Sequence, residues 1–134
     1  MPPLRPIRTP GAPAPVGPYT QAIVANGFVF ASGQIPLDPG TGKLVEGEIE
    51  AQAERVLDNL RAVLEAAGSS LANVVRASVY LTDLSLFPRV NAVYARYFGA
   101  EPPPARSTLG VAALPLGAQI EIDVIATLGE GAAQ

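Results

Sequence analysis

The stretch IEAQAERVLDNLRAVLEAAGSSLANVVRASVYLTD, residues 49–83, decides the fold, because the spacing of its apolar residues changes from helical to strand-like. In its first half apolar side chains recur every three or four residues, which predicts an amphipathic helix over residues 49–67. Gly68 is well placed to end this helix. From Val74 onward apolar residues alternate with polar ones, which predicts a strand.

The segment before this helix predicts a β-hairpin. Two strand-like runs, residues 21–25 and 28–32, flank Asn26-Gly27, a pair that favours the type I′ turn joining antiparallel strands. The connection LDPGTGKLVEG, residues 37–47, is rich in turn residues, with one short strand expected around Leu44 and Val45.

The segment after residue 83 predicts a second helix and two more strands. In SLFPRVNAVYARYFG, residues 85–99, Ser85 is expected to cap the helix, Pro88 fits its first turn and Gly99 ends it. Strands are then predicted within STLGVAALP, residues 107–115, and AQIEIDVIATL, residues 118–128.

This order of elements predicts a single α/β (α+β) domain over residues 1–134, with residues 1–12 loosely ordered. Two helices can cover only one face of a mixed five- to six-stranded sheet. Several strands nevertheless carry apolar residues on both sides, among them IVANGFVFA and IDVIATL. The uncovered face is therefore expected to pack against other subunits, which favours a homo-oligomer with a site between subunits.

The composition excludes several kinds of chemistry. The chain has no cysteine and no histidine, which removes thiolate nucleophiles, zinc–thiolate sites and the commonest general base. The lone lysine, Lys43, lies in a turn, where a solvated side chain is favoured over a Schiff base.

A net charge of −3 and no basic run argue against nucleic-acid binding. No run is long enough to span a membrane and no secretory signal is evident, so a cytoplasmic protein is expected.

Arg106 and Glu121 are the strongest candidates for a site. Three prolines stiffen the backbone before Arg106, whose planar guanidinium suits a carboxylate or phosphate. Its alternative is an ordinary surface arginine or ion pair. Glu121 shares one face of an apolar strand with Asp123, and could activate or orient a water. An ion pair or a solvated sheet face is the alternative for Glu121.

Four further positions are individually weak candidates. Ser32 and Gly33 end a strand, where a hydroxyl and a backbone N–H could meet a small anion, or simply form a turn. Tyr19 could equally pack, and Asn91 could equally be an exposed helix residue.

Taken together, these segments resemble the RidA (YjgF) family of small trimeric deaminases. The resemblance runs from GPYTQAI to EIDVIAT, and its most specific part is PPARSTLGVAALPLGAQIEIDVIA, residues 103–126. It implies a chorismate-mutase-like subunit in a homotrimer, with clefts between subunits. It also implies hydrolysis of 2-aminoacrylate-type enamines and their imine tautomers, such as 2-iminobutanoate and 2-iminopropanoate, to 2-oxo acids and ammonia. No metal or organic cofactor is implied.

The resemblance also implies roles for single residues. Arg106 would bind the substrate carboxylate and Glu121 would activate the water, while Tyr19, Ser32, Gly33, Asn91 and Thr108 would line the cleft. Many relatives carry cysteine where Thr108 stands, so only a backbone contact is expected there.

Three other functions stay open at this point. A non-catalytic binding or regulatory module for small 2-oxo acids could use the same arginine, because a fold does not settle a function. Ribonuclease action, associated with some relatives, is opposed by the charge and the missing histidine. The sequence does not test a chaperone-like role.

Overall fold

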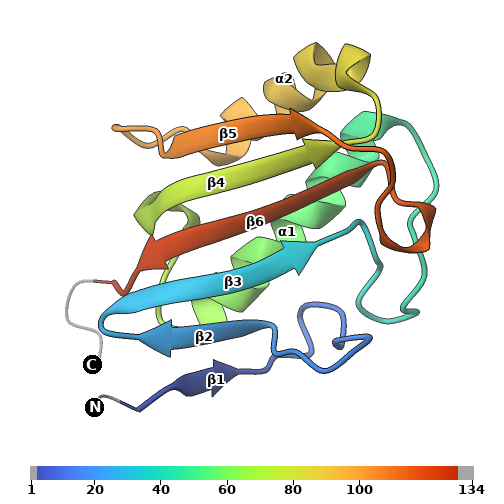
Figure 1. Cartoon of the computed structure of the whole chain (residues 1–134). Helices are drawn as coiled ribbons and strands as arrows, with labels where there is room; N and C mark the ends of the chain where they lie inside the picture. Colours follow the sequence, from blue (N-terminus) through green and yellow to red (C-terminus); the bar gives the residue numbers. More distant parts are fainter. Residues whose placement is uncertain (1–2, 130–134) are drawn as a thin grey trace.

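The computed structural model of the protein describes residues 3–129. Six strands form one sheet in the order β1-β2-β3-β6-β4-β5 (Figure 1). Their bounds are β1 (Arg5–Ile7), β2 (Ala22–Ala25), β3 (Phe28–Gln34), β4 (Val74–Leu81), β5 (Ala105–Gly110) and β6 (Ile120–Thr127). All neighbours are antiparallel except β4 and β5, so the predicted mixed sheet is confirmed in its six-stranded form.

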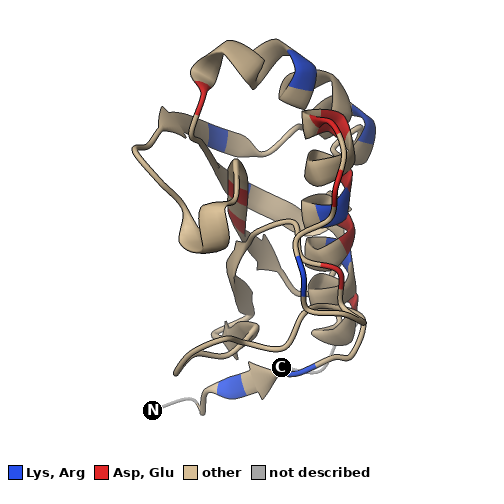
Figure 2. Ribbon diagram, turned by 90° about the vertical axis from the view of Figure 1, so that its right-hand side faces the viewer, with Lys and Arg blue, Asp and Glu red and all other residues tan. Residues whose placement is uncertain are grey.

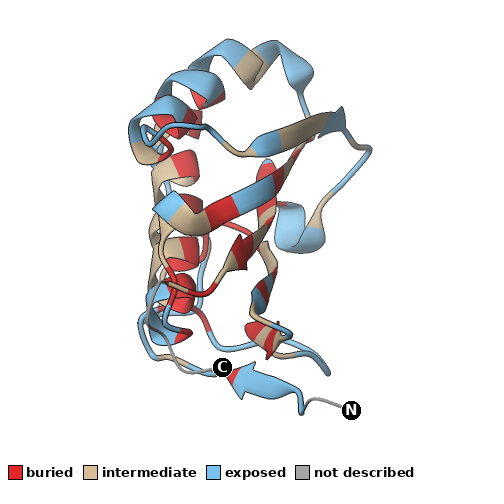
Figure 3. Cartoon of the chain, turned by 90° about the vertical axis from the view of Figure 1, so that its left-hand side faces the viewer, coloured by how far each residue is buried: buried red, intermediate tan, exposed pale blue. Residues whose placement is uncertain are grey.

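Two helices cover one face of this sheet, as the sequence predicts. They are α1 (Ile49–Ala66) and α2 (Phe87–Tyr97), and α2 forms the crossover between the parallel strands β4 and β5. Three short 3-10 turns complete the chain: η1 (Leu71–Asn73), η2 (Leu84–Leu86) and η3 (Pro115–Gly117). Figure 3 shows the buried residues on the sides of the helices and the sheet that face each other.

The core lies between α1 and the sheet because both elements carry apolar stripes of the right period. Leu57, Leu60 and Leu64 of α1 are fully buried, as are Ile120 and Ile122 of β6. Burial of one such side chain contributes about 1.5–3 kcal/mol. Alternate residues of β6 are buried and partly exposed, so every second side chain reaches the opposite face.

The predicted hairpin and helix end are confirmed. Asn26 and Gly27 both have positive φ, 52° and 80°, as a type I′ turn requires. Gly68 has a φ of 88°, and its N–H donates to the Glu65 carbonyl at 3.1 Å. The next N–H, of Ser69, donates to the Leu64 carbonyl at 2.8 Å, which completes a Schellman motif.

The segment expected to be loosely ordered carries an edge strand from residue 5 to residue 7. β1 pairs with β2, and Ile7 and Ala12 are buried in the core. Pro6 suits an edge strand, because it has no N–H to leave unpaired. Arg5 further ties this strand to the end of α1 by donating to the Ala67 carbonyl at 3.1 Å. Residues 1 and 2 lie outside the described part.

Three local predictions differ from the structure. The strand expected near Leu44 is a single bridge to Leu37. Ser85 does not cap α2, because it lies inside η2, which Asp83 caps by accepting from the Ser85 N–H at 3.0 Å, and Leu86 takes the N-cap position of α2. The strand expected over residues 107–115 is shifted: β5 begins at Ala105 and ends at Gly110.

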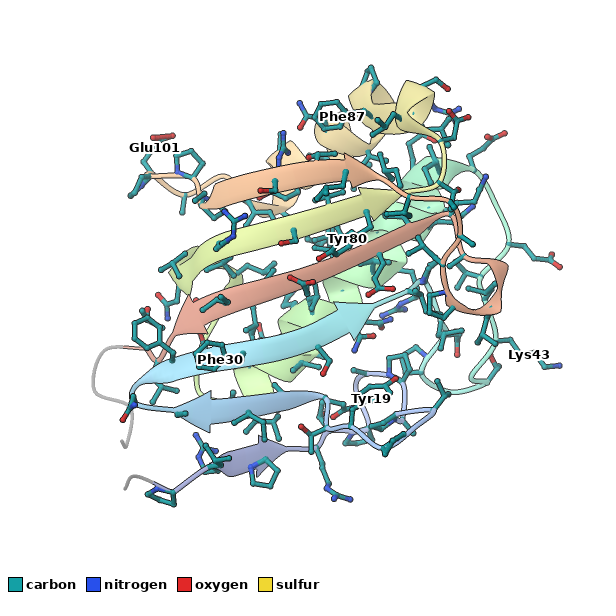
Figure 4. The ribbon with its side chains drawn as sticks, in the orientation of Figure 1. Tyr19, Phe30, Lys43, Tyr80, Phe87 and Glu101 are labelled. Carbon is teal, nitrogen blue, oxygen red and sulfur yellow. The ribbon has the colours of Figure 1, made fainter. Side chains whose placement is uncertain are left out.

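The face of the sheet away from the helices is open and partly apolar. Phe28 and Phe30 are exposed there, and Figure 4 shows Phe30 and Tyr80 on this face. Charged residues instead gather on the helices, as Figure 2 shows. Neither helix within residues 3–129 is long and apolar enough to cross a membrane.

Candidate functional site

The predicted site residues fall into two separate groups. Tyr19, Ser32, Gly33 and Glu121 line one cavity of about 360 Å³, which we call the Glu121 half-site. Asn91 and Arg106, together with Tyr94, line another cavity of about 420 Å³ beside α2, which we call the Arg106 half-site. Thr108 follows Arg106 by two residues on β5 and shares its face of the strand.

The two half-sites lie on opposite faces of the sheet. Arg106 is aligned with the buried Ala77 of β4 and contacts α2, so its side chain is on the helix-covered face. Glu121 is aligned with Tyr80 on the open face. Because β4 separates β5 from β6, the two backbones are also about 10 Å apart. One chain therefore does not bring Arg106 and Glu121 together on one small molecule.

Gly33 makes room for the Glu121 carboxylate. The register between β3 and β6 shifts between Ala31 and Gln34, which leaves Ser32 and Gly33 in a β-bulge. A Cβ on Gly33 would overlap a Glu121 carboxylate oxygen and lie 2.8 Å from the carboxyl carbon. An alanine here would therefore force the Glu121 carboxylate, at the end of a flexible side chain, away from its observed position.

The Glu121 carboxyl is suited to proton transfer. Burial, and after it the charge of Asp123, raises the pKa of Glu121 above its ordinary value of 4.5. No hydrogen bond or salt bridge within residues 3–129 holds the Glu121 carboxylate, so the ion-pair alternative for this residue is not observed. A carboxyl with a raised pKa and no partner can accept a proton from water and return it.

Asp123, unlike Glu121, has a hydrogen-bond partner. The Tyr80 hydroxyl donates to its carboxylate at 3.1 Å, across the strand pair β4–β6. Burial first, and then the charge of Asp123, raises the pKa of Tyr80. Asp123 therefore has a structural partner, whereas Glu121 is left free to face the cavity.

Ser32 and Tyr19 have local contacts of their own. The Ser32 hydroxyl donates to the Thr20 carbonyl at 2.6 Å. Toward a ligand, this hydroxyl can therefore act only as a hydrogen-bond acceptor. The Tyr19 hydroxyl accepts from the Val16 N–H at 3.3 Å, and its side chain is 47% exposed. Both residues line the cavity.

Gln21 holds the proline-rich loop that carries Tyr19. This side chain is buried, and its amide N–H groups donate to the carbonyls of Thr9, Ala12 and Pro13 at 3.1, 3.3 and 2.9 Å. Its carbonyl accepts from the Thr9 N–H at 2.7 Å. A third cavity, of about 540 Å³, shares Ala14, Tyr19 and Gln21 with the Glu121 half-site but includes none of Ser32, Gly33 or Glu121, and is lined by residues of this loop.

Apart from Gln21 and Gln34, the rest of the Glu121 half-site is apolar. Its wall includes Val16, Ile35, Leu37 and Pro115, and Glu121 is the one charged side chain among its described lining residues. An uncharged group is therefore favoured in this part of the cavity.

In the Arg106 half-site the guanidinium is held by one face of α2. An N–H of Arg106 donates to the Asn91 carbonyl oxygen at 2.8 Å. The guanidinium carbon lies 5.2 Å from the centre of the Phe87 ring and 4.6 Å from that of Tyr94. Arg106 makes no salt bridge with any residue from 3 to 129, so the ion-pair alternative is again not observed. A positioned cation without an acid is suited to bind an anion.

Tyr94 carries a buried hydroxyl without a hydrogen-bond partner in the described part of the chain. Burial raises the pKa of this hydroxyl. The neighbouring Arg106 guanidinium opposes that rise through its charge and through a contact with the hydroxyl oxygen that does not have the geometry of a formed hydrogen bond. An unpaired buried polar group costs about 1–3 kcal/mol, so stability alone does not explain a tyrosine here.

Three residues that contribute to the two half-sites were not predicted from the sequence: Phe87, Tyr94 and Gln21. The helix face formed by Phe87, Asn91 and Tyr94, spaced by four and three, was a usable signal, but it resembles an ordinary buried stripe. Gln21 is a polar residue at the start of an apolar strand, which is a weaker signal. Within residues 3–129 no group of three or more acidic side chains could hold a metal ion.

Comparisons with known proteins identify the relatives of this chain. Residues 9–128 match the family model described as Endoribonuclease L-PSP. The chain is 52% identical to Reactive Intermediate Deaminase A, chloroplastic, from Arabidopsis thaliana, over 91% of this chain and 65% of that protein. It is similar to the crystal structure of RidA from the Antarctic bacterium Psychrobacter, with 47% identity, a TM-score of 0.88 and coverage of 92% and 99%. A structure of E. coli TdcF with bound serine matches with 37% identity, a TM-score of 0.87 and coverage of 93% and 99%.

Proposed function

The chain belongs to the RidA (YjgF, L-PSP) family, and we propose that it is a hydrolytic deaminase of reactive enamines and imines. Its substrates are 2-aminoacrylate-type enamines and their imine tautomers, such as 2-iminobutanoate and 2-iminopropanoate. The products are 2-oxo acids and ammonia. We place this reaction in the cytoplasm, as the sequence predicts, although the Arabidopsis thaliana relative is named as chloroplastic.

The observation that carries this proposal is that the Arg106 guanidinium is held in place without an acidic partner in the described part of the chain. Its guanidinium is positioned by Asn91 and by two aromatic rings, yet no acid neutralises it among residues 3–129. A single planar cation fits the one carboxylate of a 2-imino acid. The remaining N–H groups of Arg106 bind that carboxylate with charge-assisted hydrogen bonds.

Glu121 supplies the proton transfers. Its carboxylate accepts a proton from the attacking water while the water oxygen bonds to the imine carbon and the C=N π bond opens. Glu121 then passes this proton to the nitrogen, which gives a neutral carbinolamine and restores the carboxylate. In the second stage the carbinolamine hydroxyl loses its proton to Glu121, the C–N bond breaks, and the proton passes to the departing ammonia. An imine carbon is already electrophilic, so water and one carboxyl suffice and no metal or organic cofactor takes part.

Two copies of the chain build each site. Arg106 and Glu121 lie on opposite faces of the sheet, so we propose that the Arg106 half-site of one subunit meets the Glu121 half-site of its neighbour. Contacts between two different surface patches run head to tail, and they close into a ring when the rotation between neighbouring subunits permits it. We infer a homotrimer, in which the exposed Phe28 and Phe30 of the open face are covered by other subunits.

A non-catalytic binding module for small 2-oxo acids is the second candidate. The observation that favours it is the E. coli TdcF structure, whose ligand is serine, a small amino acid. Such a module has no use for a free Glu121 carboxyl with a raised pKa, because binding a monoanion does not call for a nearby acid. Ribonuclease action is disfavoured by the net charge of −3 and the missing histidine.

The test is to generate 2-iminobutyrate in situ and to follow 2-oxobutyrate formation with the native protein and with Glu121→Gln. Loss of the proton shuttle is expected to lower kcat by about a hundredfold or more. Binding of 2-oxobutyrate should change less than threefold, because Arg106 is intact. Glu65→Gln, an exposed glutamate of α1, is the matched control and should behave as native. If the native protein binds 2-oxobutyrate without accelerating loss of the imine, the binding module replaces the enzyme.

A further inference from the structure

We propose that Tyr94 and Phe87 are positioning residues that hold the Arg106 guanidinium, through their rings, in the orientation that binds a carboxylate. The proposal rests on the proposed role of Arg106 as the carboxylate anchor. Neither aromatic residue is itself required to touch the substrate.

The spacing along α2 is the first support. Phe87, Asn91 and Tyr94 follow one another by four and three residues, so they share one face of the helix. Phe87 and Tyr94 are two turns apart, about 10 Å along the axis. With the guanidinium carbon 5.2 Å from one ring centre and 4.6 Å from the other, Arg106 lies between them.

The hydrogen bonding is the second support. Asn91 accepts from one terminal N–H of Arg106 at 2.8 Å and so fixes rotation of the guanidinium within its plane. The two rings restrict its tilt out of that plane, because a cation is attracted to an aromatic face. The other N–H groups remain for the ligand, and little freedom has to be lost when it binds.

The unpaired hydroxyl of Tyr94 separates this role from ordinary core packing. Phenylalanine would fill the same space without a buried polar group. Tyr94→Phe should therefore keep the Tm of the native protein or raise it. Because it keeps the ring, it should also bind 2-oxobutyrate within threefold of native.

Removing a ring is the decisive change. Tyr94→Leu and Phe87→Leu are each expected to raise the Kd for 2-oxobutyrate and the KM for 2-iminobutyrate about tenfold, or about 1.4 kcal/mol. The kcat should stay within threefold, because the carboxylate is bound equally in the ground and transition states. A purely structural defect would instead lower the amount of active protein and leave KM unchanged.

Tyr97→Leu is the matched control on the same helix. The Tyr97 ring lies 5.1 Å from the Arg61 guanidinium and its hydroxyl donates to Asp58, away from Arg106. This variant loses a comparable aromatic contact, so its Kd and KM should stay within twofold of native.

Three outcomes overturn the proposal. Tyr94→Leu and Phe87→Leu bind 2-oxobutyrate with the native Kd, or Tyr97→Leu loses as much affinity as they do, or Tyr94→Phe binds 2-oxobutyrate as weakly as Tyr94→Leu. The last outcome would assign the effect to the hydroxyl. Since Kd is measured on the folded protein by calorimetry, with Tm as the check of folding, the series gives its answer even if the protein turns over no imine.

Discussion

Replacing Arg106 by alanine removes the proposed anchor and little else. In the free chain this side chain makes one side-chain hydrogen bond, to Asn91, and contacts two rings of α2. We therefore expect the Tm to change by no more than about 5 °C. The loss should appear in substrate binding and turnover instead.

The size of the expected loss in kcat/KM follows from the hydrogen bonds that the Arg106 guanidinium can form with a bound carboxylate. Two charge-assisted bonds to a carboxylate contribute about 1.5–3 kcal/mol each, so losing both costs about 3 kcal/mol or more. Since each 1.4 kcal/mol is tenfold, kcat/KM for 2-iminobutyrate should fall about a hundredfold or more. Arg106→Lys keeps the charge without the planar fork and should lose about tenfold.

The assay measures initial rates of 2-oxobutyrate formation from 2-iminobutyrate generated in situ, with spontaneous hydrolysis subtracted. Arg96→Ala is the control, because Arg96 is an exposed arginine of α2 paired with Glu54 at 2.6 Å. Surface pairs of this kind contribute at most about 1 kcal/mol to stability, and none of it to catalysis. An Arg106→Ala protein within threefold of native kcat/KM would refute the anchor role.

Three further outcomes are expected. Gly33→Ala places a Cβ against the Glu121 carboxylate and should lower kcat about tenfold or more, whereas Gly99→Ala, whose Cβ would meet nothing closer than 3.9 Å, should be neutral in the same assay. The acid limb of the kcat/KM pH profile should have a pKa above 4.5, because Glu121 must be ionised to accept a proton. Because the folded state raises the pKa of Glu121, the neutral carboxyl stabilises the fold below the ordinary pKa, and this stabilisation is lost as the pH rises through the raised pKa. Glu121→Gln should therefore flatten the acid limb of the profile and remove this pH dependence of Tm. Gln21→Leu leaves three carbonyls and one N–H of the proline-rich loop unpaired and should lower stability by about 3 kcal/mol in denaturant unfolding, with a shift of less than 1 kcal/mol arguing against the tether.

The elements that the sequence predicts well are those set by local patterns. The α1 stripe, Gly68 at its end and the Asn26-Gly27 turn depend on neighbours within a few residues, and all three are confirmed. β1 was not predictable in this way, because a three-residue strand containing Pro6 has no period of its own. It exists because β2 and the core offer it long-range partners.

In the candidate site, too, the residue types could be predicted from local sequence but their arrangement in space could not. Arg106 and Glu121 were selected by residue type and by resemblance, but nothing local indicates that they occupy opposite faces of one sheet. That result depends on the register of β5 and β6 with β4, which only the folded chain shows. The aromatic contacts of Arg106 likewise join residues of α2 to a strand that follows it in sequence.

The most direct test of a site shared between subunits is to mix two inactive variants. Arg106→Ala and Glu121→Gln chains, carrying different tags, are unfolded together in equal amounts, refolded and assayed with 2-iminobutyrate. In a closed ring with one Arg106 and one Glu121 from adjacent subunits at each site, random mixing restores both residues at about one site in four. We predict recovery of about a quarter of native activity. Activity that stays at the level of the two separate variants would contradict a site built from two copies of the chain.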